Sequence, residues 1–367
     1  MASFFSSFFK KTETSILGVD AGSSAIKIVQ VKKKHGKAVL ETYGELALGP
    51  YGGMEVGRAV SLPSDKLIEA IRDILREAKT TTVSCGAALP LSSSLITFLN
   101  IPPVSDKEIG EIVTMEARKY IPVPLTEVFL DYSVIPKEET FSGQDETAKT
   151  EKAGREVLVV AIHNEYLSEY QSVMAGSGLQ PSFYEIEIFS SIRAVVDQGL
   201  ATVMILDMGA RSTKLYIIER GILRASHIIN KGGQDITLAL SKALSIEVAD
   251  AESLKRSRGL KGGPEYKEPT EIITVNLDYV FYEANTALLN YQKKYGKNVG
   301  SIIMTGGGAL LKGLIDLAKI GFQTQVITAD PFGKLETPAF LAEEFASAGP
   351  EFAVAIGAAL RRLSEAE

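Results

Sequence analysis

The chain has 367 residues, with 45% hydrophobic and 23% charged residues and a formal net charge of −6. Such a composition is typical of a folded globular chain with more than one domain, and it excludes a mainly disordered chain. The negative charge gives no support for nucleic-acid binding, and the single cysteine, Cys85, excludes an internal disulfide framework and a cysteine-based zinc site.

The N-terminal residues, 1–11, read MASFFSSFFKK. A secretory signal peptide carries its basic residues before its apolar stretch, and here the order is reversed. The four phenylalanines and the lysines after them suit a membrane surface, while packing on protein is the open alternative. The uncharged stretch 80–105 contains Pro90, Pro102 and Pro103, so we expect two buried strands there and not a membrane-spanning helix. With the lone cysteine, these features predict a cytoplasmic protein.

A β-hairpin is predicted next, with strands at 16–19 and 25–31 around a turn at 20–24. A strand over 39–48 follows, and apolar residues at helical spacing predict a helix over 64–79.

The stretch 95–178 then interrupts this lobe with an alternation of its own. Ser105 is expected to cap a helix that runs to Tyr120, with Glu108 completing a capping box. The polar stretch 137–155 is expected to be a loop. The remaining predicted elements are strands at 95–101, 128–135 and 157–162 and a helix at 164–177.

A second hairpin opens the last part of the chain, with strands at 203–207 and 213–219 around a turn at 208–212. Further strands, a long helix over 269–295 and a closing helix over 352–363 follow. The predicted division is therefore a first lobe formed by residues 1–94 and 179–198, an inserted α+β subdomain at 95–178, and a second lobe at 199–367, with the closing helix 352–363 packing between the lobes.

The two hairpins repeat one pattern: Asp and Gly are two residues apart, and Asp and Lys are seven apart. A tight glycine-containing turn after a strand aims backbone N–H groups at an anion, hydroxyls add donors and lysine adds positive charge. Two copies at matched spacing indicate an internal duplication that binds a phosphate chain. The predicted phosphate-binding residues are Asp20, Gly22, Ser23, Ser24, Lys27, Asp207, Gly209, Ala210, Arg211, Ser212 and Lys214.

Asp20 and Asp207 raise an apparent conflict, because bare carboxylates repel phosphates. A Mg²⁺ ion between them removes the repulsion, since Mg²⁺ keeps several waters and takes few carboxylates. We therefore expect both aspartates to hold Mg²⁺ through water.

A strand over 301–304 runs into Gly306, Gly307 and Gly308, and a helix is expected from Ala309. Glycines at such a strand-to-helix turn allow the backbone to approach a flat ring and a ribose closely. This motif predicts the adenosine end of a nucleotide site.

Hairpin, hairpin and triple glycine, in that order, resemble the two phosphate motifs and the adenosine motif of the actin, heat-shock chaperone and sugar-kinase superfamily. The resemblance implies an α/β, actin-like (ribonuclease H-like) duplicated two-lobe fold with ATP at the bottom of a cleft. It also implies that Gly232, Gly233 and Asp235 lie at the entry to a helix beside the nucleotide. Glu252 and Lys255 resemble positions that face ribose and adenine, and a solvated helix face is the alternative for these two.

The insert resembles the extra subdomain, called 1C, of FtsA-like proteins. Four stretches are similar to the PilM family of type IV pilus assembly proteins: LGVDAGSSAIK from residue 17, ALPLSSS from 88, EARKYIPVP from 116 and VFLDY from 128. This resemblance implies a cytoplasmic ATP-binding component, peripheral on the inner face of the cytoplasmic membrane, in a platform with other pilus and motor components. It also implies that a groove between the first lobe and the insert holds the N-terminal cytoplasmic peptide of the membrane protein PilN. Self-association stays open.

Whether ATP is hydrolysed depends on a residue that orients the attacking water. Glu185 and Glu187 are the candidates, because a carboxylate can act as a base. Carboxylates near a helix start are also common because they complement the helix dipole, and that reading is favoured here. Two alternatives to the pilus function remain: an FtsA-like, membrane-associated filament-forming ATPase and a small-molecule kinase.

Overall fold

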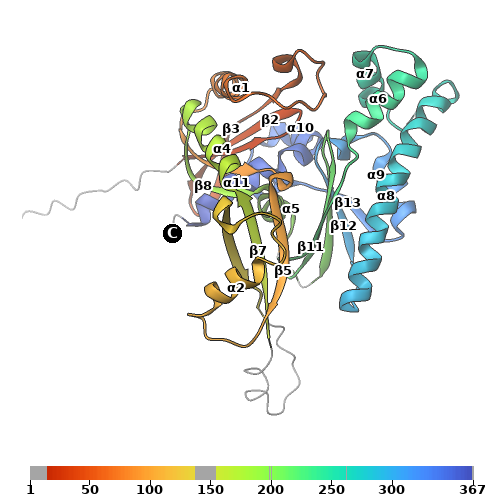
Figure 1. Cartoon of the computed structure of the whole chain (residues 1–367). Helices are drawn as coiled ribbons and strands as arrows, with labels where there is room; N and C mark the ends of the chain where they lie inside the picture. Colours follow the sequence, from red (N-terminus) through yellow and green to blue (C-terminus); the bar gives the residue numbers. More distant parts are fainter. Residues whose placement is uncertain (1–14, 137–153, 198, 200, 262, 366–367) are drawn as a thin grey trace, which may run out of the picture.

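The structure is a computed structural model, and it describes residues 15–136, 154–197, 199, 201–261 and 263–365. Two lobes lie side by side, and a narrow insert projects from the first lobe (Figure 1). The phenylalanine-rich residues near the N-terminus and most of the predicted polar loop lie outside the described residues.

The first lobe is a five-stranded sheet in the order β3-β2-β1-β4-β8. Its central strand β1 is apolar on both faces, because helices cover both sides of the sheet, and the neighbouring residues Ile16 and Leu17, which point to opposite faces, are both buried. The strands are β1 (Ser15–Ala21), β2 (Ala25–Lys34), β3 (Lys37–Ala47), β4 (Ser84–Leu89) and β8 (Gln180–Ile186), and the helices are α1 (Ser64–Glu77), α4 (Asn164–Gly176) and α5 (Glu187–Val195).

The second lobe repeats this topology, with strand order β11-β10-β9-β12-β13. In each sheet the first three strands are antiparallel and the last two run parallel to the central strand. The duplication seen in the hairpins therefore extends to both whole sheets. The elements are β9 (Thr202–Met208), β10 (Thr213–Glu219), β11 (Ile222–Ile229), β12 (Ser301–Thr305), β13 (Gln325–Thr328), α6 (Gly233–Leu244), α7 (Val248–Arg258), α8 (Lys267–Tyr295) and α9 (Leu314–Phe322).

The insert is a three-stranded sheet in the order β5-β7-β6, covered by α2 and holding a small core of its own. Both predicted ends of its helix are wrong, because the helix ends at Ala117 and not at Tyr120. Ser105 and Glu108 do bond to each other, through the Ser105 N–H and hydroxyl, but the helix begins only at Ile109. The elements are β5 (Ser94–Ile101), α2 (Ile109–Ala117), β6 (Val128–Val134) and β7 (Arg155–His163).

Two segments pack differently from the predicted division. Helix α4, assigned to the insert, packs on α1, and its Tyr170, Val173 and Met174 belong to the core of the first lobe. The residues after β13, assigned to the second lobe, also join the first: Phe332 and Phe345 form an aromatic cluster with Tyr43 of β3. Tertiary packing, which local pattern does not report, decides both cases.

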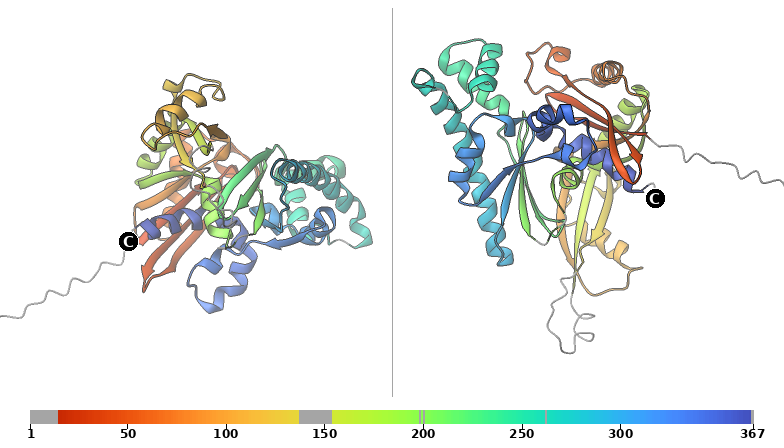
Figure 2. Two further views of the ribbon diagram at one scale, coloured as in Figure 1. Left: turned by 90° about the horizontal axis from the view of Figure 1, so that it is seen from below. Right: turned by 180° about the vertical axis from the view of Figure 1, so that it is seen from behind.

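The closing helix α11 (Ala353–Glu365) follows α10 (Ala342–Ala348) and lies against β1, β2 and α5. Figure 2 shows it, in dark blue, beside the red strands of the first lobe. The approach is close: a Cβ added at Gly18 of β1 would lie 1.9 Å from the Ala355 carbonyl oxygen, and one added at Gly357 would lie 1.9 Å from that of Ser190. Backbone therefore packs directly on backbone at two points of the first lobe.

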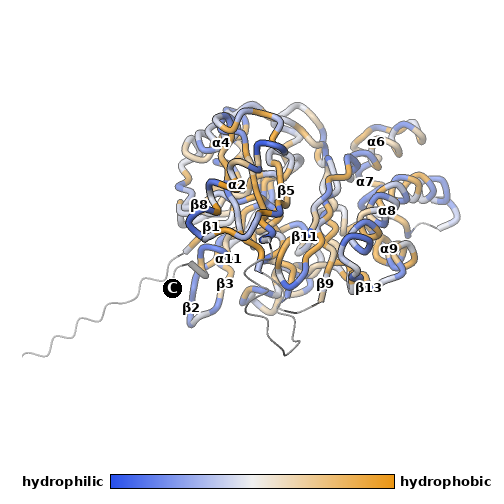
Figure 3. The backbone as a smooth tube through the Cα atoms, turned by 60° about the horizontal axis from the view of Figure 1, so that its bottom comes forward, coloured by the Kyte–Doolittle hydropathy of each residue, from blue (hydrophilic) through white to orange (hydrophobic). Residues whose placement is uncertain are grey.

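The uncharged stretch 80–105 contains β4 and β5, as expected, and not one long helix. Among the described residues, no helix has the length and apolar character needed to cross a membrane. Hydrophobic residues follow the central strands, while α8 alternates between hydrophilic and hydrophobic residues (Figure 3).

Candidate functional site

The two hairpin turns have the same geometry. The Gly22 N–H donates to the Ala25 carbonyl at 3.0 Å, and the Gly209 N–H donates to the Ser212 carbonyl at 3.1 Å. The spacing between aspartate and lysine also has one structural cause. Asp20 pairs across the strands with Lys27, and Asp207 with Lys214, in antiparallel register. Directly opposed residues lie on one face of a sheet, so each turn carries a carboxylate and an ammonium side by side.

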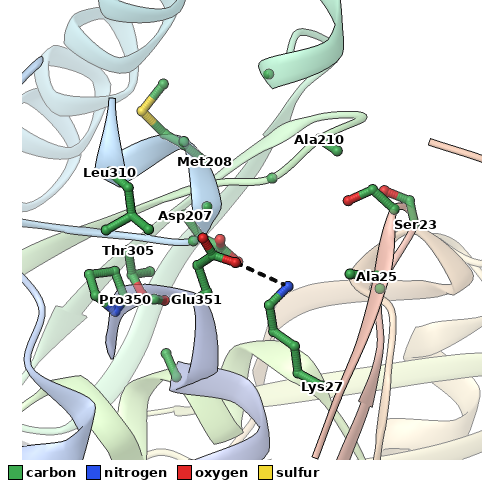
Figure 4. Close-up of a pocket in the computed structure, with 18 of the residues that line it drawn as sticks. Ser23, Ala25, Lys27, Asp207, Met208, Ala210, Thr305, Leu310, Pro350 and Glu351 are labelled. Atoms are coloured by element: carbon green, nitrogen blue, oxygen red, sulfur yellow. Dashed lines mark hydrogen bonds and ion pairs between the residues drawn. The ribbon is translucent and has the colours of Figure 1, made fainter. Parts of the chain in front are cut away.

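A cavity of about 320 Å³ lies between the two turns and the triple glycine. Figure 4 shows side chains from both lobes around it, with Ser23 and Lys27 opposite Asp207 and Met208. Most predicted residues meet here. Those that line it are Asp20, Gly22, Ser23, Ser24, Lys27, Glu187, Asp207, Gly209, Ala210, Lys214, Gly233, Glu252, Lys255, Gly306, Gly307 and Gly308.

Five predicted residues do not line this cavity. Arg211 and Ser212 line a neighbouring cavity of about 480 Å³, and an Arg211 Nη atom donates to the Val60 carbonyl at 3.0 Å. Gly232 and Asp235 hold the start of α6, where the Gly232 N–H donates to an Asp235 carboxylate oxygen at 2.8 Å. The fifth, Glu185, is bonded to Ser190, Arg193 and Arg361.

Burial disfavours the charged form of both aspartates. Burial raises the pKa of Asp20 to about 7, against the lowering effect of Lys27, and Glu187 and Asp207 raise it further. Burial also raises the pKa of Asp207, although Lys214 opposes the shift. Two buried carboxylates that resist ionisation in the wall of one cavity form a place where a cation is stabilised.

Both lysines are held by carboxylates. Lys27 lies 3.3 Å from Glu45 and 3.7 Å from Glu351, and Lys214 lies 2.5 Å from Glu187 and 3.8 Å from Asp207. Burial lowers the pKa of Lys27 and of Lys214, but these carboxylates outweigh it and raise both above the ordinary lysine value. Two ammonium groups therefore stay charged beside the aspartates.

Glu185 and Glu187 have different surroundings. Glu185 is buried, accepts from Ser190, Arg193 and Arg361, and is absent from the cavity wall. It joins β8, α5 and α11 and is not positioned to touch a ligand in the cavity. Glu187 lines the cavity, but both of its oxygens are occupied, one by Lys214 at 2.5 Å and one by the Leu91 N–H at 2.6 Å.

Glu252 and Lys255 lie 2.6 Å apart on α7 and face the cavity. Glu252 is only 7% exposed and also accepts from Thr237 at 2.5 Å and from Arg256 at 2.6 Å. Lys255 donates to the Gly233 carbonyl at 3.1 Å. This network joins α7 to the start of α6, so the pair does not belong to a solvated helix face.

The triple glycine is needed at two of its three positions. Gly306 has a φ of +78°, and a Cβ there would lie 2.4 Å from an Asp207 carboxylate oxygen. A Cβ at Gly308 would lie 2.6 Å from the Cβ of Met208, whereas one at Gly307 would make an ordinary contact at 3.5 Å. The helix expected from Ala309 is instead a short 3₁₀ helix over Gly307–Leu310, and α9 begins at Leu314.

Several lining residues carry no local sequence signal. Glu351 lies two residues before the closing helix, and burial raises its pKa although Lys27 opposes the shift. Glu45 is an ordinary residue of β3, and Thr305 donates its hydroxyl to the Pro350 carbonyl at 2.8 Å. The one available signal was the predicted start of the closing helix at residue 352, which directly follows Glu351 in the sequence.

The carboxylates of Asp20 and Asp207 suit a divalent cation that takes few ligands from the protein and keeps most of its water ligands. The described part of the chain holds no group of three or more His, Cys, Asp or Glu side chains that could coordinate a metal. Asp20 and Asp207 alone would leave most coordination positions to water and phosphate oxygens, which is how Mg²⁺ is ordinarily bound.

Comparisons with known proteins agree with this geometry. The family model described as type IV pilus assembly protein PilM matches residues 18–363. The cell division protein FtsA of Bacillus subtilis is 22% identical over 358 residues, which cover 86% of this chain and 78% of FtsA. The solved PilM–PilN type IV pilus biogenesis complex aligns with a TM-score of 0.79 at 25% identity, over 96% of this chain and 99% of the other. MreB5 of Spiroplasma citri bound to ADP has a TM-score of 0.52 at 13% identity, over 96% of both chains, and so shares the actin-like fold.

Proposed function

This chain belongs to the PilM family of type IV pilus assembly proteins, and we propose that it binds ATP with Mg²⁺ between its lobes and docks a PilN-like peptide beside that site. We further propose that it works in the cytoplasm, peripherally on the inner face of the membrane. The observation that carries the nucleotide proposal is the pair of matched turns, each with a cross-strand aspartate and lysine, at one cavity.

The chain's own residues suggest how a nucleotide would be held. The turns at Gly22 and Gly209 have room for close approach, and Ser23 and Ser24 supply hydroxyls at the cavity wall. Mg²⁺ would supply positive charge between the phosphates and the aspartates, whose burial makes bare ionisation costly. The Glu252 and Lys255 pair, with the triple glycine, leaves space at the opposite end for a nucleoside.

The second cavity, of about 480 Å³, supports the peptide proposal because the segments that enter and leave the insert line one side of it. Pro90, Ser92 and Ser93 lead directly into β5, and α4, which follows β7, supplies Tyr166 and Glu169. Both cavities share wall residues, so a nucleotide-dependent change at the turns would reach the peptide groove. The shared residues are Asp20, Gly22, Ser23, Glu187 and Lys214.

ATP hydrolysis needs a residue that orients the attacking water molecule. Glu185 lies outside the cavity, and each oxygen of Glu187 already accepts one hydrogen bond, which makes Glu187 a weaker base toward a water molecule. We propose slow ATP hydrolysis at most.

Titration calorimetry with ATP and Mg²⁺ tests the nucleotide site. Wild-type protein should bind, and replacing Asp20→Ala together with Asp207→Ala should weaken binding at least about 100-fold, because the cation loses both protein carboxylates. Asp316→Ala, at a side chain that is 73% exposed, is the matched control. Unchanged affinity in the double variant would show that the site assignment is wrong.

Fluorescence anisotropy tests the peptide groove, with a labelled peptide of the cytoplasmic N-terminus of PilN from the same genome. Saturable binding that changes when ATP and Mg²⁺ are added is expected. Ser92→Trp should block the groove, whereas Ser347→Trp on α10 should not. No saturable binding in either nucleotide state would remove the peptide proposal and leave the nucleotide site untouched.

A further inference from the structure

Helix α8 carries a stripe of apolar residues that nothing in the described chain covers. Val275 and Tyr282 are each 68% exposed, Leu289 is 54% exposed and Tyr279 is 49% exposed. The opposite face packs on the core of the second lobe through Ile273, Leu277 and Phe281. Large apolar side chains repeated along one solvent-facing helix stripe are typical of a helix that packs against another helix.

Five residues of the exposed stripe are arranged symmetrically about Tyr282, which is one of them. Val275 and Leu289 lie seven residues before and after Tyr282, and Glu271 and Lys293 lie eleven residues before and after it. All five side chains belong to exposed residues. Along an α-helix, steps of seven and eleven residues return to nearly the same side, so the five residues form a single stripe.

This arrangement matches what a two-fold interface requires. In a symmetric dimer each residue on one side meets its counterpart from the other side, so the surface must complement itself in reversed direction. An antiparallel pair of α8 helices crossing at Tyr282 would set Val275 opposite the second copy's Leu289, and Glu271 opposite the second copy's Lys293. The two-fold axis would then give two apolar contacts between Val275 and Leu289 and two ion pairs between Glu271 and Lys293.

We propose that the exposed stripe of α8 is the interface for a second copy of this chain, packed antiparallel about Tyr282. Helix α8 lines neither the nucleotide cavity nor the second cavity. From Glu271 to Lys293 the helix spans about 33 Å. One helix pair of this length buries less than the roughly 800 Å² per partner of a standard stable complex, so the dimer is weak and depends on concentration. In the single chain Glu271 lies 3.8 Å from Lys267, a largely exposed pairing that is easily exchanged.

Cysteine cross-linking tests the register, because the only native cysteine, Cys85, is buried. Under mild oxidation Tyr282→Cys should form a covalent dimer, since the two-fold axis places it next to its own copy. Val275→Cys alone should not form a covalent dimer, but a mixture of Val275→Cys and Leu289→Cys should. Ile320→Cys, which replaces a residue that is 76% exposed on α9, measures random collision. Equal cross-linking at 282 and 320, or efficient self-linking at 275, would overturn the proposal.

Charge exchange tests the same interface without cysteines. Analytical ultracentrifugation should show that Glu271→Lys weakens the dimer roughly tenfold, because two symmetry-related pairs change together. The double variant Glu271→Lys with Lys293→Glu should restore it, and high salt should weaken the wild-type dimer. A monomer at all concentrations up to the millimolar range, or assembly that is insensitive to both variants, would contradict the inference.

Discussion

The Lys214 ammonium lies 2.5 Å from a carboxylate oxygen of Glu187, which ties the second hairpin to the first residue of α5. Both side chains are largely buried. Lys214→Met should therefore leave the Glu187 charge buried without its closest partner and lower the free energy of unfolding by about 3 kcal/mol. Urea denaturation measures this loss.

The exposed pair of Lys66 and Glu69 provides the control for that variant. These residues lie 2.8 Å apart on α1 with side chains 46% and 52% exposed. Lys66→Met should change the free energy of unfolding by no more than about 0.5 kcal/mol. Similar losses in both variants would mean that the Lys214–Glu187 ion pair stabilises the fold no more than an exposed ion pair does.

A pH dependence follows from Asp20. Its pKa is about 7 in the folded protein and near 3.8 when unperturbed, so between those values the folded state holds a proton that the unfolded state has released. In the ligand-free protein, the contribution of Asp20 to the free energy of unfolding should be largest below about pH 4. It should fall as the pH rises and become constant above about pH 7. The slope approaches 1.4 kcal/mol per pH unit at most.

Asp20→Asn should remove that slope, because the amide does not titrate. Urea midpoints at pH 5, 6, 7 and 8 in magnesium-free buffer check it. Parallel profiles for wild type and variant would show that Asp20 ionises normally in the folded protein.

Gly306 and Gly307 form a matched pair of test positions. Gly306→Ala would place a Cβ 2.4 Å from an Asp207 oxygen at a φ of +78°, and should lower the free energy of unfolding by about 2 kcal/mol and ATP affinity at least about tenfold. Gly307→Ala meets its nearest atom at 3.5 Å and should stay within about 0.5 kcal/mol of wild type. Thermal melts and calorimetry measure both effects, and equal behaviour of the two variants would contradict the steric argument.

Gly357 should be the least replaceable residue of α11. A Cβ there would lie 1.9 Å from the Ser190 carbonyl oxygen, so Gly357→Ala must push α11 away from α5 and cost about 3 kcal/mol of stability. Gly199→Ala, at a position with no atom within 4 Å, is the neutral control. Differential scanning calorimetry compares them, and a melting temperature for Gly357→Ala close to that of wild type would refute the close packing.

Much of the fold could be predicted from the sequence, because both hairpins and the long helix α8 follow from local patterns. The matched spacing of Asp20 to Lys27 and Asp207 to Lys214 works because an antiparallel register is a local property. The glycine positions follow from turn geometry in the same way. Such signals are confined to a few neighbouring residues of the chain.

The site residues that the sequence did not predict correctly depend on contacts between distant parts of the chain. Glu185 looked equivalent to Glu187, but its partner Arg361 lies far away in sequence and draws it out of the cavity. Glu351 reaches the cavity only because the C-terminal segment folds back on the first lobe. Arg211 is drawn to the Val60 carbonyl on the other lobe. A single sequence does not reveal which distant groups will meet.

The packing of α11 against β1 has a consequence for biosynthesis. The first lobe contains the earliest strands of the chain, yet Ala355, Ile356 and Ala359 of its core come from the last helix. During translation that core cannot close until α11 has left the ribosome, whereas the cluster on one face of the second lobe's sheet lies within residues 204–326. That cluster can form first, whereas the N-terminal sheet must wait for α11, and so must the other face of the second lobe's sheet, with Ile205 and Tyr216. Until then, apolar surface stays exposed of the kind that a chaperone binds.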